Sequence, residues 1–146
     1  MLNYNYVLTI DKGRQNEMTT TQATVTQIGE QALGHADPIV VLFGEEATAE
    51  IAAIAVIQRF AAPAQQRALT VAVGDTIQVG AAAYTITYVG RAAQNNLRSL
   101  GHVAFVFSDT AQGDRLQNGL YLHPIADAPR FPDFQAGTTI SYTHHV

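Results

Sequence analysis

Hydrophobic and polar residues alternate along several short segments of the chain, which is the pattern of half-buried strands. The alternation is clearest at residues 23–28 and 83–89. Two other runs, 39–43 and 102–107, are almost continuously apolar, as expected of strands that are buried on both faces. Further short strands are predicted at 76–79, 120–123 and 138–143.

The segment from Glu45 to Glu50 combines helix formers with acidic residues that suit a helix N-terminus. Thr48 can cap this helix. The following run is rich in Val, Ile and Phe, so we predict that the helix turns into a strand near Ala53 or Ile54. Residues 61–67, which contain Pro63, are predicted to form a loop.

A second short helix is predicted after Gly90. Asn95 or Asn96 can cap it, and Leu97 and Leu100 then lie three residues apart on one face. Gly101 is placed to end this helix in a left-handed conformation.

About seven short strands, frequent Gly and Pro punctuation and two small helices predict a mostly β barrel or sandwich. Residues 11–17 are polar and linker-like, so residues 1–20 are assigned to a loosely ordered N-terminal extension. The remaining residues, 21–146, fit one domain.

The composition excludes several classes of function. Charged residues make up only 14% of the chain, the net charge is −4, and the eight Lys and Arg residues are scattered. A nucleic-acid binder needs clustered basic residues, so this class is not expected. Cysteine is absent, which excludes a disulfide framework, a thiolate metal site and a cysteine nucleophile.

The beginning of the chain lacks the basic and apolar regions of a signal peptide. The longest apolar run, residues 51–57, is far shorter than the roughly 20 residues of a membrane-spanning helix. We therefore expect a cytoplasmic protein without direct membrane insertion.

Few residues remain as candidates for chemistry, because no phosphate-binding loop, dinucleotide fingerprint or zinc-protease motif occurs. His144 and His145 are adjacent, and adjacent side chains on a strand point to opposite faces, so they are not expected to share a metal ion. A ragged C-terminal end is the preferred interpretation. Neither a metal nor a cofactor is predicted.

His102 follows Gly101 at the start of an apolar strand and has two interpretations. A structural histidine would bond a neighbouring backbone carbonyl and fix the helix-to-strand corner. A functional histidine would lie at the mouth of the barrel or sheet, close to Arg98 and Arg91.

The run Val89-Gly90 followed by Asn96-Leu97-Arg98-Ser99-Leu100-Gly101-His102-Val103 closely resembles the glucitol/sorbitol-specific IIA component of the bacterial sugar phosphotransferase system. The resemblance covers about residues 21–146. It implies a closed β-barrel of about seven strands. It also implies a cytoplasmic phosphocarrier that receives a phosphoryl group on histidine from the histidine-containing phosphocarrier protein. That group then passes to the IIB component, and the IIB/IIC transporter phosphorylates sorbitol during import.

The chain departs from the family pattern at the acceptor. Alignment on Phe43 and Ile51 places Gln58 where the family has its phospho-acceptor histidine, and a glutamine amide has no comparable nucleophilic nitrogen. Whether the chain is a phosphocarrier-type transferase is therefore open.

Two hypotheses follow from this substitution. In one, His102 is the acceptor, with Arg98, Arg91 or Arg59 next to the phosphate. In the other, the chain is a non-catalytic binding or regulatory protein.

Overall fold

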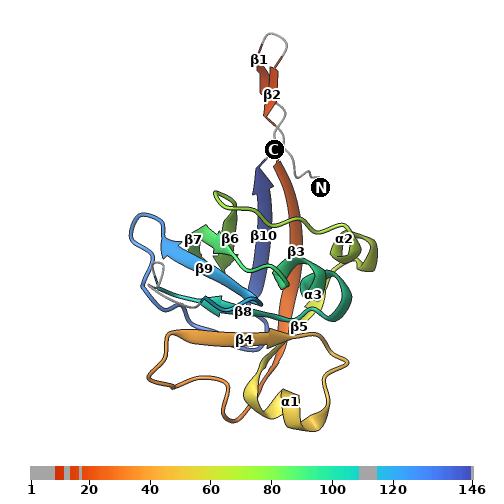
Figure 1. Cartoon of the computed structure of the whole chain (residues 1–146), viewed down its shortest axis with the longest axis vertical. Coiled ribbons are helices and arrows are strands. Elements are labelled where there is room, and N and C mark those ends of the chain that lie inside the picture. The colour runs from red at the N-terminus through yellow and green to blue at the C-terminus, as the bar shows by residue number, and fades with distance from the viewer. Residues whose placement is uncertain (1–8, 12–13, 17, 109–114, 146) are drawn as a thin grey trace.

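The computed structural model describes residues 9–11, 14–16, 18–108 and 115–145. Its main body is a closed barrel with three short helices on its outside (Figure 1). The barrel strands are β3 (Met18–Ile28), β4 (Ile39–Phe43), β5 (Val56–Phe60), β6 (Thr76–Val79), β7 (Ala82–Val89), β8 (Val103–Val106), β9 (Gly119–Pro124) and β10 (Thr139–His145). The helices are α1 (Ala49–Ile54), α2 (Pro63–Arg67) and α3 (Ala93–Leu100).

The barrel closes in the order β10-β3-β5-β4-β8-β9-β7-β6, and β6 pairs with β10. The β4–β5 and β8–β9 pairs are parallel and the other pairs are antiparallel. The mostly β class and the barrel are thus confirmed. Within the described residues, eight strands close this barrel, rather than about seven, and three helices rather than one or two accompany it.

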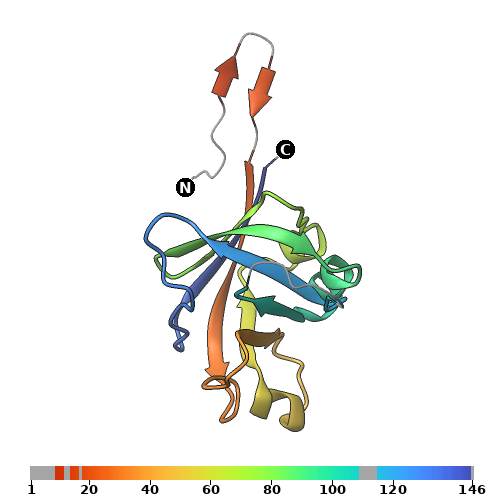
Figure 2. The same ribbon diagram turned by 60° about the vertical axis from the view of Figure 1, so that its left-hand side comes forward.

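A two-stranded hairpin, β1 (Thr9–Asp11) with β2 (Arg14–Asn16), stands apart from the barrel (Figure 2). The first barrel strand, β3, begins at Met18 and pairs with β10 as far as His145. Residues 1–8, 12–13 and 17 of the proposed N-terminal extension lie outside the described residues. Its loosely ordered character stays a prediction.

The second predicted helix is present as α3, and Gly101 ends it with φ +64°. The predicted cap was wrong, because the helix begins at Ala93 rather than after Asn95 or Asn96. A contact with a distant part of the chain sets this start: the Ala92 N–H donates to the Gln117 carbonyl at 2.8 Å. Thr48 caps α1 as predicted, accepting a hydrogen bond from the Ile51 N–H at 3.3 Å.

The predicted loop at 61–67 contains the short helix α2 instead. Pro63 occupies its first turn, where the missing N–H costs nothing. The Gln66 side chain donates to the Leu97 carbonyl at 3.0 Å, which fastens α2 to α3. The two helices therefore lie together on one side of the barrel (Figure 1).

Large apolar and aromatic side chains fill the barrel. Tyr84 and Phe107 meet edge to face with their ring centroids 5.2 Å apart, and the Tyr84 hydroxyl donates to the Pro129 carbonyl. Burial raises the pKa of Tyr84 to about 12 from its ordinary value near 10. The folded state therefore favours the neutral phenol.

This burial predicts a loss of stability in alkali. The contribution of the neutral Tyr84 phenol to the free energy of unfolding is fully present below about pH 10. It is lost as the pH rises toward the folded-state pKa of about 12. Denaturant unfolding measured from pH 8 to 12 should show a falling free energy of unfolding above pH 10. The free energy of unfolding should fall less steeply with pH in Tyr84→Phe. An unchanged dependence on pH would contradict the raised pKa of Tyr84.

Candidate functional site

Gln58, which the sequence analysis aligned with the family's acceptor, lies inside the barrel on β5. Its side chain is almost fully buried, at 1% exposure. The amide nitrogen donates to the Gly101 carbonyl at 3.0 Å, and the amide oxygen accepts from the Tyr142 hydroxyl at 2.7 Å. Burial raises the pKa of the Tyr142 phenol, which keeps its hydroxyl a donor. Gln58 thus ties β5 to β10 and to the corner after α3.

His102 lies at that corner, half-buried between α3 and β8. Its Nδ1 is 3.0 Å from the Leu42 carbonyl oxygen, and its ring packs against Phe43 with the centroids 4.6 Å apart. Because a carbonyl only accepts, Nδ1 carries the proton and the lone pair is on Nε2. This is the carbonyl bond expected of a structural histidine, and it leaves one ring nitrogen as an acceptor.

The three candidate arginines do not gather around one point. Arg98 donates from Nε to the Leu69 carbonyl at 2.6 Å and from Nη2 to the Thr70 hydroxyl at 3.4 Å, which fastens α3 to the segment after α2. Arg59 lies on the outer face of β5, with a 62% exposed side chain that forms an ion pair with Glu45 at 3.6 Å. Arg91 is exposed at the end of β7.

A depression of about 260 Å³ opens on the surface above Gln58. Arg59 and Glu45 lie on its polar side, and Pro63 and Gln66 of α2 contribute another wall. Gln58 therefore lies beneath a hollowed surface, with its side chain bonded inside the barrel.

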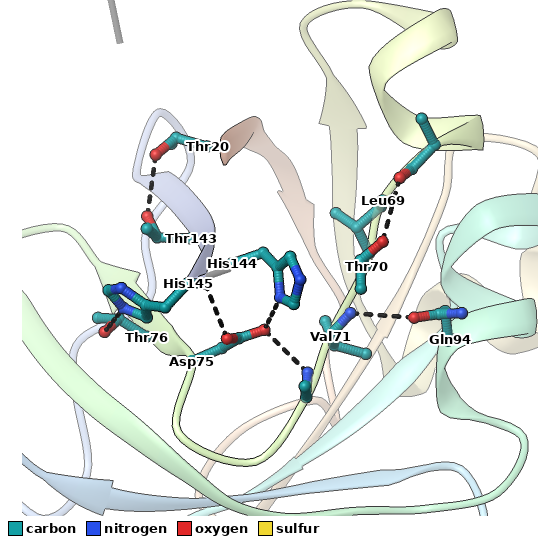
Figure 3. A network of polar contacts seen from close by, with 12 residues as sticks. Thr20, Leu69, Thr70, Val71, Asp75, Thr76, Gln94, Thr143, His144 and His145 are labelled. Carbon is teal, nitrogen blue, oxygen red and sulfur yellow. Dashed lines mark hydrogen bonds and ion pairs between the residues drawn. The ribbon is translucent and has the colours of Figure 1, made fainter. Parts of the chain in front are cut away.

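Sequence reasoning missed a histidine–carboxylate pair between His144 on β10 and Asp75, which directly precedes β6 (Figure 3). His144 Nδ1 is 2.7 Å from Asp75 Oδ2, and the Asp75 side chain is buried. The neighbouring His145 points the other way, with Nε2 at 3.1 Å from the Thr76 hydroxyl. These two histidines belong to an ordered strand, so the interpretation as a ragged C-terminal end was wrong. They do point to opposite faces.

Across residues 9–11, 14–16, 18–108 and 115–145, no group of three or more His, Asp or Glu side chains is arranged to hold a metal ion. In that same part of the chain, no helix has the length and apolar character to cross a membrane.

Three comparisons relate this geometry to known proteins. A family model described as the "PTS system glucitol/sorbitol-specific IIA component", where PTS stands for phosphotransferase system, matches residues 20–141. A search of curated proteins finds no match. Among solved structures, the PTS system IIA component from Enterococcus faecalis V583 is similar, with 40% sequence identity and a TM-score of 0.74. That match covers 83% of this chain and 98% of the other.

The family model spans most of the barrel, from β3 into β10, and the solved relative shares the fold at substantial identity. The chain therefore belongs to the family of glucitol/sorbitol-specific IIA components of the phosphotransferase system.

Proposed function

We propose that this protein is an accessory component of sorbitol uptake that binds proteins of the phosphotransferase system but carries no phosphate on residue 58. Its partners are the cytoplasmic histidine-containing phosphocarrier protein and the sorbitol IIB/IIC transporter. The observation that carries the proposal is the Gln58 amide, which is buried and hydrogen-bonded at both ends.

The chemistry of the amide supports this proposal. Resonance delocalises the nitrogen lone pair of an amide into its carbonyl, so the nitrogen is a donor and not a nucleophile. Turning Gln58 toward the surface would also orphan the Gly101 carbonyl and the Tyr142 hydroxyl, each at a cost of about 1–3 kcal/mol. The residue is therefore suited to holding the barrel together.

The surface above Gln58 suits a phosphorylated partner. Arg59 is an exposed cation at the edge of the depression, which Glu45 and Glu46 also line. An anionic phosphohistidine brought there would take the place of Glu45 as the partner of Arg59. Leu100, which is 44% exposed, contributes apolar area beside it. A partner docking here would meet the apolar residues Phe60, Pro63 and Leu100 next to charged ones.

One observation favours a second candidate, relay through His102. The bond from Nδ1 to the Leu42 carbonyl leaves Nε2 with the lone pair that a phosphoryl acceptor needs. Of the arginines predicted to neighbour such a phosphate, Arg98 is engaged with Leu69 and Thr70.

Binding of the phosphocarrier protein tests the proposed function. When the ¹⁵N-labelled chain binds this protein, the NMR resonances of residues around the depression and α2 should shift. Arg59→Glu should weaken binding about tenfold, mostly through slower association. Arg130→Glu is the matched control, because it makes the same charge change at an exposed position in the connection to β10. Absence of binding up to about 1 mM, a weak limit equivalent to roughly 4 kcal/mol, would overturn the proposal. Equal weakening by both variants would overturn the placement of the docking surface.

A further inference from the structure

The carboxylate of Asp75 is a fixed, buried partner for His144. It is 2% exposed and accepts three hydrogen bonds. The Ala72 N–H and His144 Nδ1 bond Oδ2 at 2.8 and 2.7 Å, and the His145 N–H bonds Oδ1 at 3.0 Å. With its position fixed by two backbone donors, the carboxylate holds the His144 ring in one orientation with the proton on Nδ1.

The remaining nitrogen of His144, Nε2, has no hydrogen-bond partner within the part of the chain that the structure describes. The residue lines a cavity of about 140 Å³ together with Tyr142 and three threonines, Thr19, Thr21 and Thr70. The His144 side chain is 25% exposed, so solvent reaches it. In the neutral imidazole this unbonded nitrogen carries the lone pair of a nucleophile, and the residue that bears it lines the cavity.

The cavity selects a small group. Its volume is about half of the roughly 300 Å³ at which pockets for whole drug-sized ligands begin. Thr19 and Thr21 contribute hydroxyls that can donate to an anion. The Thr70 hydroxyl instead donates to the Ala68 carbonyl and accepts from Arg98 at 3.4 Å, which places a cation next to the cavity lining. These features fit a phosphoryl group better than a sugar.

The cavity lies next to the depression over Gln58. Helix α2 separates the two: Pro63 and Gln66 line the depression, whereas Gln65 lines the His144 cavity. Tyr142 connects them, because its hydroxyl bonds Gln58 while its side chain also lines the cavity. A partner docked over α2 therefore covers both.

We propose that His144 Nε2 is a phosphoryl acceptor of this chain and that Asp75 is its positioning residue. The inference rests on the proposed function, since the phosphocarrier protein must dock for the donor to arrive. The Nε2 lone pair attacks the phosphorus of the donor's phosphohistidine and forms a new N–P bond. The old N–P bond breaks, and its electron pair returns to the donor ring.

The proton balance explains the role of Asp75. The donor ring changes from a phosphorylated imidazolium to a neutral imidazole, and the His144 ring changes from neutral to imidazolium, so no external proton is needed. Asp75, a buried carboxylate 2.7 Å from Nδ1, stabilises the positive charge that develops on His144. His102 lacks this advantage, because its Nδ1 faces the neutral carbonyl of Leu42.

The test is incubation of the full chain with enzyme I, the phosphocarrier protein and labelled phosphoenolpyruvate. Wild type should acquire an acid-labile label, and His144→Gln should lose at least about 95% of it, whereas His102→Gln keeps it. Glutamine at 144 can still donate to Asp75, so the fold is preserved without the nucleophile. Asp75→Asn should slow labelling by about tenfold or more while leaving the phosphocarrier affinity unchanged.

The ring nitrogen provides a second readout. Since Nδ1 is held by Asp75, NMR of the phosphorylated chain should identify the Nε2-phosphohistidine isomer. Three results would overturn the assignment of His144 as the acceptor and leave the proposed function standing. They are label that persists in His144→Gln, an Nδ1-phosphohistidine isomer, and no label in a wild-type chain that still binds the phosphocarrier protein. Absence of that binding would overturn both.

Discussion

Replacing Gln58 with leucine is expected to lower the free energy of unfolding by about 2–6 kcal/mol, the sum for two orphaned buried polar groups. Leucine has a similar volume but cannot accept from the Tyr142 hydroxyl or donate to the Gly101 carbonyl. Both groups would stay buried without a partner. Denaturant unfolding of wild type and variant at neutral pH measures the loss.

Tyr142→Phe supplies the control for this prediction. In the Gln58→Leu background it removes one of the two orphaned groups, so the double variant should be more stable than the sum of the single losses implies. A coupling energy of about 0.5–3 kcal/mol is expected for residues that share such a bond. A leucine variant as stable as wild type would show that residue 58 is not held in the core by these bonds.

A Gly90→Ala substitution is expected to cost about 3 kcal/mol or more, the upper range for forcing atoms into a packed interior. An added Cβ would lie 2.3 Å from the Gln117 carbonyl oxygen and 2.5 Å from that of Leu116. Both obstacles are backbone atoms, and the Gly90 N–H is itself bonded to the Gly119 carbonyl at 2.8 Å, so the two segments cannot simply separate. Thermal and denaturant unfolding report the loss.

Gly119→Ala is the matched control on the opposing strand. There an added Cβ would meet its nearest atom, Cβ of Leu116, at 3.1 Å, which requires a shift of only a few tenths of an ångström. We expect a loss of about 1 kcal/mol, at the lower end for overpacking. Equal effects of the two substitutions would contradict a specific close approach at Gly90.

Local signals explain which parts of the fold could be predicted from the sequence. The end of α3 at Gly101 and the cap of α1 at Thr48 depend on neighbouring residues and were predicted correctly. The start of α3 and the existence of α2 depend on bonds to residues far away in sequence, Gln117 and Leu97, and were missed.

The candidate site divides in the same way. The burial of Gln58 could not be predicted from its own strand, because its two partners, Gly101 and Tyr142, come from other elements. Asp75 and His144 are separated by 69 residues and meet only because β6 pairs with β10 as the barrel closes. Read separately, Asp75 is a turn residue and His144 a terminal one.

The central claim is that phosphate bypasses residue 58 and is taken up at the end of β10. Trypsin separates the candidate histidines, because it cleaves after Arg59, Arg98, Arg115 and Arg130. One product ends at Arg59 and contains Gln58, and the others of interest are the peptides 99–115, 116–130 and 131–146. Alkaline peptide mapping of the phosphorylated wild-type chain should place the label on 131–146, which holds His144. The claim would be contradicted by label on the peptide 99–115, which holds His102. Label on the peptide 116–130, or on the peptide that ends at Arg59, would contradict it as well.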